Sequence, residues 1–299
     1  MRSLRSVDEL REALELARRA GATIGLVPTM GALHEGHLSL IERARAQCDT
    51  VVVSLFVNPS QFDERVDLER YPRQEEHDRE LAEGADADLL FAPSPEEVYP
   101  PGFATSVEVL GLTDRLEGAM RGASHFRGVT TVVTKLLNMV APDVAYFGQK
   151  DAQQVIVIRR LVQDLNLAVR IEACPTVRER DGLAMSSRNG RLSPEERSRA
   201  VGLHAALRAA SAAAESGERS GERLLRAGRE ALAPFELELE YLALVSPETL
   251  LPVAQLEEPA LLAIAARAGR TRLIDNVTLT PTVRTQSPNP REAQAICSA

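Results

Sequence analysis

Residues 27–38 read VPTMGALHEGHL, and this stretch decides the fold that we expect of the whole chain. A short apolar run precedes it and an amphipathic segment follows it, so the stretch joins a strand to a helix. His34 and His37 are three residues apart and share one face of that helix, and Gly36 between them lets a ligand approach the backbone closely. Because free N–H groups at a helix N-terminus attract anions, this turn is a candidate phosphate site.

Other interpretations of the histidine pair stay open on the tetrapeptide alone. An isolated HxGH pattern can arise by chance, or one of its histidines can pack in a core. The strand–turn–helix context, and the presence of two of the five histidines in one turn, favour a functional site. A metal site would need a third ligand, and no nearby His or Cys supplies one.

Outward from this turn, the first half of the chain alternates apolar runs with amphipathic segments. Such alternation is typical of a parallel sheet with helices on both faces. The run over 51–57 is continuously apolar and rich in β-branched residues, as in a strand buried on both faces. The expected strands cover 23–27, 51–57, 88–91, 144–147 and 168–172, and the expected helices cover 8–20, 38–47, 73–83, 128–140 and 151–164.

After about residue 192 the pattern changes to long helical segments followed by short strands. We expect helices over 194–215 and 222–232 and strands over 236–243, 260–266 and 272–279, which indicates a small α+β unit. The chain is therefore predicted to be an α/β protein with a Rossmann-like domain over 1–180 and a smaller α+β domain over 189–282. Residues 283–299 are polar and interrupted by proline, and they are expected to be a disordered tail.

Composition narrows the functional classes. The chain has 299 residues and a formal net charge of −8, which argues against a general nucleic-acid-binding protein. Cys48, Cys174 and Cys297 form no close pair, which fits a reducing cytoplasm better than a disulfide framework or a zinc site. The N-terminal residues read as a helix, so neither a signal peptide nor a membrane span is expected.

A second polar turn, over 147–154, reads FGQKDAQQ and also follows a predicted strand. In an open α/β sheet, ligands bind beyond the carboxyl ends of the strands. Lys150 is one of two lysines among 35 basic residues, and its flexible ammonium suits a phosphate that moves during a reaction. Asp151 could bind a ribose hydroxyl, cap the following helix, or do both. A simple glycine turn with an aspartate cap would explain Gly148 and Asp151 but not Lys150.

Two further segments carry polar side chains at strand ends. Residues 175–189 read PTVRERDGLAMSSRN, where two hydroxyls and a guanidinium can hold phosphate oxygens; alone, this segment could be a solvated loop between domains. Residues 54–62 read SLFVNPSQF, where Asn58 and Gln61 leave the end of a buried strand. Turn chemistry at the Asn-Pro pair could explain this second segment unaided.

Together the four segments resemble the pantothenate synthetase family, and the resemblance covers roughly residues 1–282. HxGH alone marks a wide superfamily of nucleotidyl transferases and class I aminoacyl-tRNA synthetases, whereas the four segments in combination are specific to this one family. Five more segments match the family: 67–73, 91–94, 98–100, 125–133 and 273–276.

The resemblance implies an ATP-dependent ligase that activates pantoate as an acyl-adenylate and joins it to β-alanine. It further implies Mg²⁺ held through the ATP phosphates, a C-terminal domain that acts as a lid, and a homodimer. The residues implied to be catalytic are His37, His34 and Lys150, with His37 as proton donor. The residues implied to bind ATP are Met30, Gly31, His34, His37, Gly148, Lys150, Asp151, Val177, Met185, Ser186, Ser187 and Arg188. The residues implied to bind pantoate or β-alanine are Gln61, Gln154, Asn58 and Tyr71.

One departure from the family pattern lies at residues 121–126, which read RGASHF. The family usually has Arg-Pro-Gly-His-Phe there, so this segment is one residue longer and lacks the proline, and we assign no role to Arg121 or His125. Lys135 also stays without a role, because it could face phosphates or merely sit on a helix.

Three rival functions remain on the sequence alone. Another HxGH nucleotidyl transferase would release a stable dinucleotide and would not need β-alanine. A class I tRNA synthetase fits poorly with a short acidic chain that shows no tRNA-binding domain. A non-catalytic ATP-binding module is disfavoured because polar residues are intact in all four segments.

Overall fold

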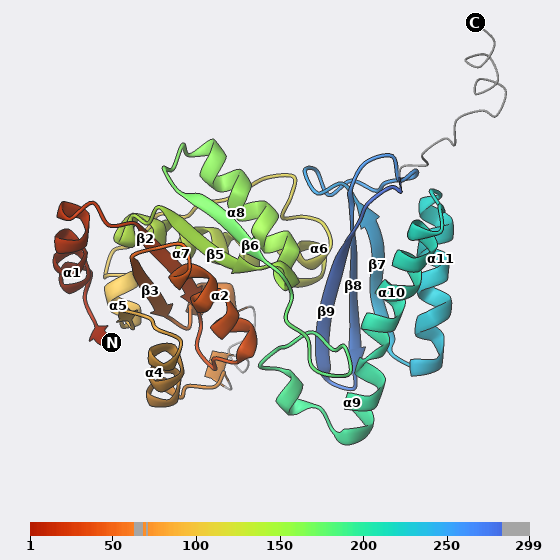
Figure 1. Ribbon diagram of the computed structural model, residues 1–299, viewed down its shortest axis with the longest axis horizontal. Helices are drawn as coiled ribbons and strands as arrows, with labels where there is room; N and C mark the ends of the chain where they lie inside the picture. Colours follow the sequence, from red (N-terminus) through yellow and green to blue (C-terminus); the bar gives the residue numbers. More distant parts are fainter. Residues whose placement is uncertain (63–67, 70, 283–299) are drawn as a thin grey trace, which may run out of the picture.

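Six strands form a wholly parallel sheet in the first part of the chain (Figure 1), which we describe from a computed structural model covering residues 1–62, 68, 69 and 71–282. The order across the sheet is β1-β4-β3-β2-β5-β6, so β3 and β2 lie at the centre and β5 lies next to β2. The strands are β1 (Arg2–Leu4), β2 (Ile24–Thr29), β3 (Thr50–Leu55), β4 (Leu89–Phe91), β5 (Val144–Gly148) and β6 (Arg170–Cys174).

Helices cover both faces of this sheet because its central strands are apolar on both sides. Leu26 and Val52 point to one face, where they pack with residues of α1, α7 and α8. Val27 and Val53 point to the other face, where they pack with residues of α2 and α4. The helices are α1 (Val7–Arg19), α2 (Glu35–Arg45), α4 (Glu75–Gly84), α5 (Pro95–Val98), α6 (Glu117–Arg121), α7 (Ala123–Val140) and α8 (Ala152–Asp164). The predicted α/β fold class is confirmed.

A three-stranded antiparallel sheet, in the order β7-β8-β9, follows in the second part of the chain. Its middle strand β8 alternates between two cores. Leu262 and Ile264 pack toward α10 and α11, whereas Leu261 and Ala263 pack with Val157 and other residues of the first part. The small sheet therefore lies between its own helices and α8 (Figure 1). Its elements are α9 (Pro194–Ala200), α10 (Gly202–Glu215), α11 (Gly221–Leu232), β7 (Glu238–Val245), β8 (Ala260–Ala268) and β9 (Thr271–Leu279).

Four short 3₁₀ turns connect these elements within the described residues. They are η1 (Pro59–Gln61), η2 (Gln149–Asp151), η3 (Asn189–Arg191) and η4 (Ala233–Phe235). Two of them, η1 and η2, follow β3 and β5 and carry polar residues that the sequence marked as candidates.

The single helix predicted over 194–215 is wrong, because Val201 separates α9 from α10. Gly202 follows, and a Cβ at this position would lie 2.6 Å from the Phe235 ring. The absence of a side chain at Gly202 therefore leaves room for Phe235 of η4. The strand predicted from residue 236 begins at Glu238 instead, since Glu236 has a φ of 51°, which a strand cannot contain.

Some predictions are not decided by these elements. The expected tail over 283–299 and part of the 67–73 segment lie outside the described residues. The domain boundaries at 180 and 189 also stay predictions. Within the described ranges, no helix combines the length and apolarity that a bilayer crossing requires.

Candidate active site

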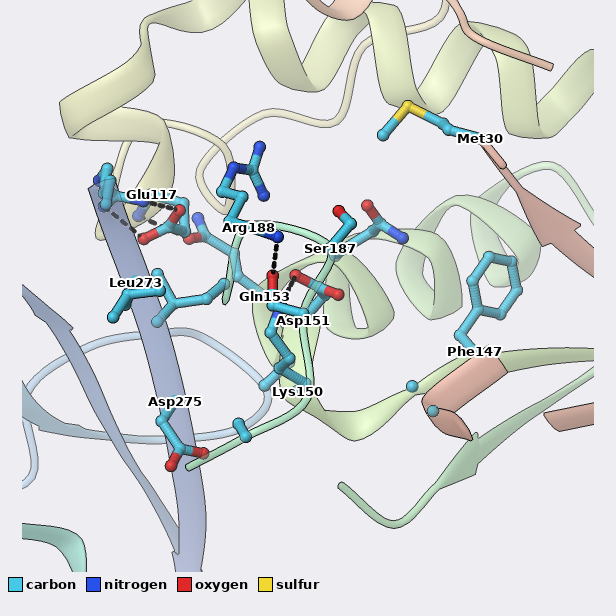
Figure 2. A pocket seen from close by; sticks show the side chains of 18 of the residues that line it. Met30, Glu117, Phe147, Lys150, Asp151, Gln153, Ser187, Arg188, Leu273 and Asp275 are labelled. Atoms are coloured by element: carbon cyan, nitrogen blue, oxygen red, sulfur yellow. Dashed lines mark hydrogen bonds and ion pairs between the residues drawn. The ribbon is translucent and has the colours of Figure 1, made fainter. Parts of the chain in front are cut away.

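A cavity of about 900 Å³ opens where the carboxyl ends of β2 and β5 face strand β9 of the small sheet. Figure 2 shows side chains from both parts of the chain converging there, with Lys150 and Asp151 near Ser187, Arg188 and Asp275. All but one of the predicted site residues line this cavity. The exception is Gly31, which lies in the turn just before the histidine pair. The structure therefore brings the four segments together around one cavity.

The turn that leads from β2 to α2 is held by a buried carboxylate. Gly31 and Ala32 both have positive φ, at 87° and 52°, so the chain reverses tightly here. The side chain of Asp78 accepts hydrogen bonds from the Ala32 and Leu33 N–H groups at 3.0 and 2.7 Å. Asp78 is 1% exposed and comes from α4. Sequence reasoning missed it, because nothing local distinguishes it from the other acidic residues of that helix.

His34 is the N-cap of α2, and this fixes the state of its ring. Its Nδ1 accepts a hydrogen bond from the Gly36 N–H at 3.1 Å, so in the neutral ring the proton resides on Nε2. Burial, and then the charge of Lys150, lower the pKa of His34. The ring can therefore donate a hydrogen bond from Nε2 without carrying a charge of its own.

His37 packs against His34, with the two ring centroids 4.1 Å apart. Burial lowers the pKa of His37 to about 3, and the nearby His34 and Lys150 act in the same direction. Its Nδ1 is buried and has no hydrogen-bond partner. A neutral imidazole with an unused nitrogen is thus available beside the positively charged end of the cavity.

Lys150 lies in η2 at the end of β5, with its Nζ 3.5 Å from Asp151 Oδ1. Although burial disfavours a charge on Asp151, Lys150 and Arg188 outweigh it and lower the pKa of that carboxyl. Asp151 occupies the N-cap position of α8, but its side chain makes no capping hydrogen bond. Helix capping therefore does not explain this aspartate, and ribose binding stays a prediction.

Gln61 is held at the end of β3 by contacts on several sides. Its Oε1 accepts a hydrogen bond from Asn58 Nδ2 at 3.1 Å, and its carbonyl is bonded to His125 Nδ1 at 2.8 Å. Helix α7 approaches closely at Gly128, where a Cβ would lie only 2.3 Å from the Ser60 carbonyl oxygen. A glycine at 128 is therefore needed to seat η1 against α7.

The amide of Asn58 is fully used within the protein. Its Nδ2 donates to Gln61 and to the Gly128 carbonyl, and its Oδ1 accepts from Ser60 and from the Tyr99 hydroxyl at 2.8 Å. Asn58 is 1% exposed. The predicted contact of Asn58 with substrate stays untested, and these contacts favour a role in positioning Gln61.

Residues 177–189 form a hairpin-like loop that presents Ser186, Ser187 and Arg188 to the cavity. Arg178 makes a two-pronged ion pair with Asp275 of β9, at 2.6 and 3.0 Å. The Tyr71 hydroxyl lies beside Ser187 and Arg188, and burial raises its pKa. The loop is therefore fixed to the small sheet at its base.

The two glutamines that follow η2, Gln153 and Gln154, have different surroundings. Gln153 is 4% exposed and bonds to backbone groups of three residues near α6, so its role is structural. Gln154 lines the cavity beside Gln153, and its predicted contact with substrate stays a prediction. Lys135 is outside the cavity lining, and its Nζ lies 4.6 Å from the centre of the Phe103 ring, a cation–π distance.

A second polar network lies at the far end of the cavity. Glu117 of α6 pairs with Arg272 of β9 through two hydrogen bonds, one of 2.7 Å, and accepts another from the Tyr241 hydroxyl. Arg272 also donates to Glu240 of β7 at 2.6 Å. These contacts join α6 to the small sheet. The sequence offered no signal for them, because the partners are far apart in the chain.

The sequence of this chain is similar to those of known proteins. The sequence model of the pantoate–β-alanine ligase family matches residues 2–278. A pantothenate synthetase from Moorella thermoacetica is 52% identical over 280 residues, which cover 93% of this chain and 99% of that one. The chain belongs to the pantoate–β-alanine ligase family.

Solved structures extend the family likeness to three dimensions. The pantothenate synthetase of Thermus thermophilus has a TM-score of 0.89 and 50% identity, over 94% of this chain and all of that one. The pantoate–β-alanine ligase of Francisella tularensis, complexed with β,γ-ATP and β-alanine, has a TM-score of 0.77 and 33% identity, over 93% of this chain and 97% of that one. The family and fold expected from the sequence are thus confirmed.

Proposed function

We propose that this chain condenses pantoate with β-alanine to pantothenate, using ATP and releasing AMP and pyrophosphate. The observation that carries the proposal is the meeting of His34, His37, Lys150 and the 185–188 loop in one cavity. The histidine turn lies more than 100 positions before Lys150 and the 185–188 loop, and together these residues supply the cations and hydrogen-bond donors that a triphosphate needs. The family relative complexed with a form of ATP and with β-alanine supports the same substrates.

The first step joins two anions, and the site residues are suited to neutralise them. An oxygen of the pantoate carboxylate attacks the α-phosphorus of ATP, and the bond to pyrophosphate breaks. We assign Lys150 and Arg188 to bind the negatively charged phosphates. We assign neutral His34 to donate a hydrogen bond from Nε2 to a phosphate oxygen. An anion next to His37 raises the pKa of that ring above its value in the free site, so it can take up a proton as the phosphates bind.

The second step consumes the pantoyl-adenylate. The neutral amine of β-alanine attacks the activated carbonyl, the bond to AMP breaks, and the nitrogen loses a proton as the amide forms. Gln61 and Gln154 line the cavity and are assigned to pantoate and β-alanine. Because the mixed anhydride is prone to hydrolysis, exclusion of water by the small sheet is part of the proposal.

Mg²⁺ is expected to accompany ATP. The described residues contain no group of three His, Cys, Asp or Glu side chains arranged as metal ligands, and a magnesium ion that keeps waters and binds phosphate oxygens needs no such cage. When bound, it would add positive charge at the phosphates. Asp151, which is near Lys150, is the carboxylate we assign to the nucleotide ribose.

We also propose, on the family resemblance, that the enzyme acts as a homodimer. The cytoplasm is its proposed location, since the few cysteines include the free and buried Cys48 and Cys174.

The test measures AMP and pyrophosphate formation from MgATP, with pantoate and β-alanine added singly and together. We expect pyrophosphate release to need pantoate, and AMP release to need both acids. If neither acid stimulates turnover although ATP binds, the substrate assignment is wrong. A nucleotidyl transfer that yields a dinucleotide would then be the function to examine.

A further inference from the structure

Two adjacent residues of β9, Asp275 and Asn276, contact both loops that carry the candidate phosphate-binding groups. They belong to the 273–276 segment, for which the family resemblance gave no role. Both side chains are buried, with exposures of 2% and 5%. A charged and a polar side chain buried side by side require partners, and the partners lie in η2 and in the 177–189 loop.

Asn276 is bonded to the backbone of Lys150 itself. Its Nδ2 donates to the carbonyl oxygens of Gln149 and Lys150 at 2.9 and 2.8 Å. Its Oδ1 accepts a hydrogen bond from Gln149 Nε2 at 3.3 Å. Both amide protons and the amide oxygen are therefore engaged with η2, and the side chain has no donor left for a ligand.

Asp275 holds the second loop through Arg178, which also donates to the Gly182 carbonyl at 3.1 Å. One oxygen of Asp275 accepts from the Asn276 N–H at 2.8 Å as well. The two neighbouring side chains thus connect one strand of the small sheet to η2 and to the base of the loop bearing Ser186–Arg188.

We propose that Asn276 is the positioning residue for Lys150, and that Asp275 fixes the 177–189 loop relative to it. The proposal deepens the proposed function and rests on it for the role of Lys150. It makes the small sheet a scaffold of the phosphate site, because Lys150 and Arg188 keep their relative places through one strand.

An asparagine suits this task better than its close analogues. Its uncharged amide grips two carbonyl oxygens without altering the charge around Lys150. In Asn276→Asp, a carboxylate without hydrogen-bond donors would face the same two carbonyl oxygens. This change should therefore lower kcat more than Asn276→Ala does. Since small misplacements of a reacting group are costly, we expect the alanine change to lower kcat about 10- to 100-fold, with a smaller effect on KM.

The direct test exploits the presence of two lysines in the chain. Reductive methylation with ¹³C-formaldehyde and a borohydride gives NMR signals for Lys135, Lys150 and the N-terminus, and a Lys135→Arg variant assigns them. In Asn276→Ala we expect the Lys150 signal to shift or broaden while the Lys135 signal stays in place. An unchanged Lys150 signal would overturn the proposal, and this readout does not depend on turnover.

The matched control is Val277→Ala on the same strand. Val277 is partly buried against the small sheet's core and is not part of the cavity lining. Val277→Ala should lower the unfolding temperature yet leave the Lys150 signal unchanged. A shift as large as that in Asn276→Ala would mean that general loosening of the small sheet explains the effect, and it would overturn the proposal.

If Asn276→Ala does not fold, Gln149→Ala serves instead. It removes the hydrogen bond that orients the Asn276 amide and should move the Lys150 signal by less.

A kinetic cycle separates this inference from the proposed function. Asn276→Ala should lower kcat in the otherwise unaltered enzyme. In a Lys150→Ala background the same change should lower kcat little further. Full additivity of the two losses would overturn the positioning role. If the unaltered chain does not make pantothenate but its Lys150 signal responds as expected, the proposed function fails while the positioning role stands.

Discussion

At the scale of single residues, the histidine pair combines proximity with neutrality. The rings of His34 and His37 are 4.1 Å apart, and Lys150 acts electrostatically on both. Two imidazolium ions at this distance would repel each other and the lysine. Because burial keeps both rings neutral, the pair offers N–H donors for an arriving anion without adding to the positive charge of Lys150.

The neutrality of His37 has a measurable effect on stability. In the folded chain its pKa is about 3, against 6.5 without perturbation, so between these values the unfolded chain binds more protons. The free energy of unfolding therefore falls as the pH drops through this window. When the pH falls from 7 to 5, the free energy of unfolding of the unaltered chain should drop by about 1–2 kcal/mol more than that of the His37→Asn variant. Urea unfolding at both pH values measures the difference, and equal losses would contradict the buried neutral state.

The charge and shape of Lys150 should both affect catalysis. Lys150→Ala should lower pantoate-dependent pyrophosphate release on the order of a hundredfold or more. Lys150→Arg should recover only part of it, because a planar guanidinium is bulkier than an ammonium. Lys135→Arg is the matched control and should keep normal turnover. Near-normal rates in Lys150→Ala would remove this residue from the proposed mechanism.

At the scale of elements, η1 and η2 place the side chains that β3 and β5 could not present themselves. Each turn leaves the end of a parallel strand and is fixed by a neighbour from elsewhere: η1 by α7, and η2 by β9. The candidate substrate and phosphate groups therefore depend on contacts between elements more than on the turns' own hydrogen bonds.

Gly128 provides a test of the contact between η1 and α7. A Cβ at this position would approach the Ser60 oxygen to 2.3 Å and the Gln61 nitrogen to 2.7 Å, so Gly128→Ala must displace η1. We expect a loss of about 2 kcal/mol of stability and a raised KM for pantoate. Gly84→Ala in α4 is the control, since nothing lies within 4 Å of its Cβ position; it should be neutral or stabilising by up to about 1 kcal/mol. Equal behaviour of the two variants would rule out this steric argument.

The sequence predicted the secondary-structure elements and the motifs better than it predicted the contacts that hold the motifs in place. Long apolar or periodic runs such as 51–57 identified the central strands, and the polar turns after them identified the cavity. The three-residue edge strand β1 was missed because it is too short to show a period. Asp78 and the Glu117–Arg272 pair were missed because such contacts depend on how distant segments pack.

At the scale of the whole molecule, the small sheet is joined to the Rossmann-like part by both apolar and polar contacts. Leu261 and Ala263 of β8 pack with Val157 of α8. Beside them, the Arg272–Glu117 pair is shielded, with side-chain exposures of 18% and 10%. This pairing lowers the pKa of Glu117 against the opposing effect of burial and raises that of Arg272.

Breaking this pair should weaken the junction strongly. Glu117→Gln leaves Arg272 without one of its two carboxylate partners, and we expect a loss of about 2–4 kcal/mol in unfolding free energy. The double change Glu117→Gln with Arg272→Met should cost less than the sum of the single changes, because no buried charge is then left unpaired. Denaturant unfolding of the three variants measures this. Simple additivity would mean that the two side chains do not stabilise each other.

Strand β9 completes the cavity, although it is the last strand in the described part of the chain. Its Asn276 grips Lys150 across an interval of 126 residues. While the protein is made on a ribosome, His34 and His37 emerge early, and the N-terminal part can begin to fold first. The grip on Lys150 forms only after residue 276 has left the exit tunnel, so a nascent chain or one cut short before β9 lacks the assembled phosphate site. Synthesis itself thus leaves the proposed phosphate site unassembled until β9 has been made.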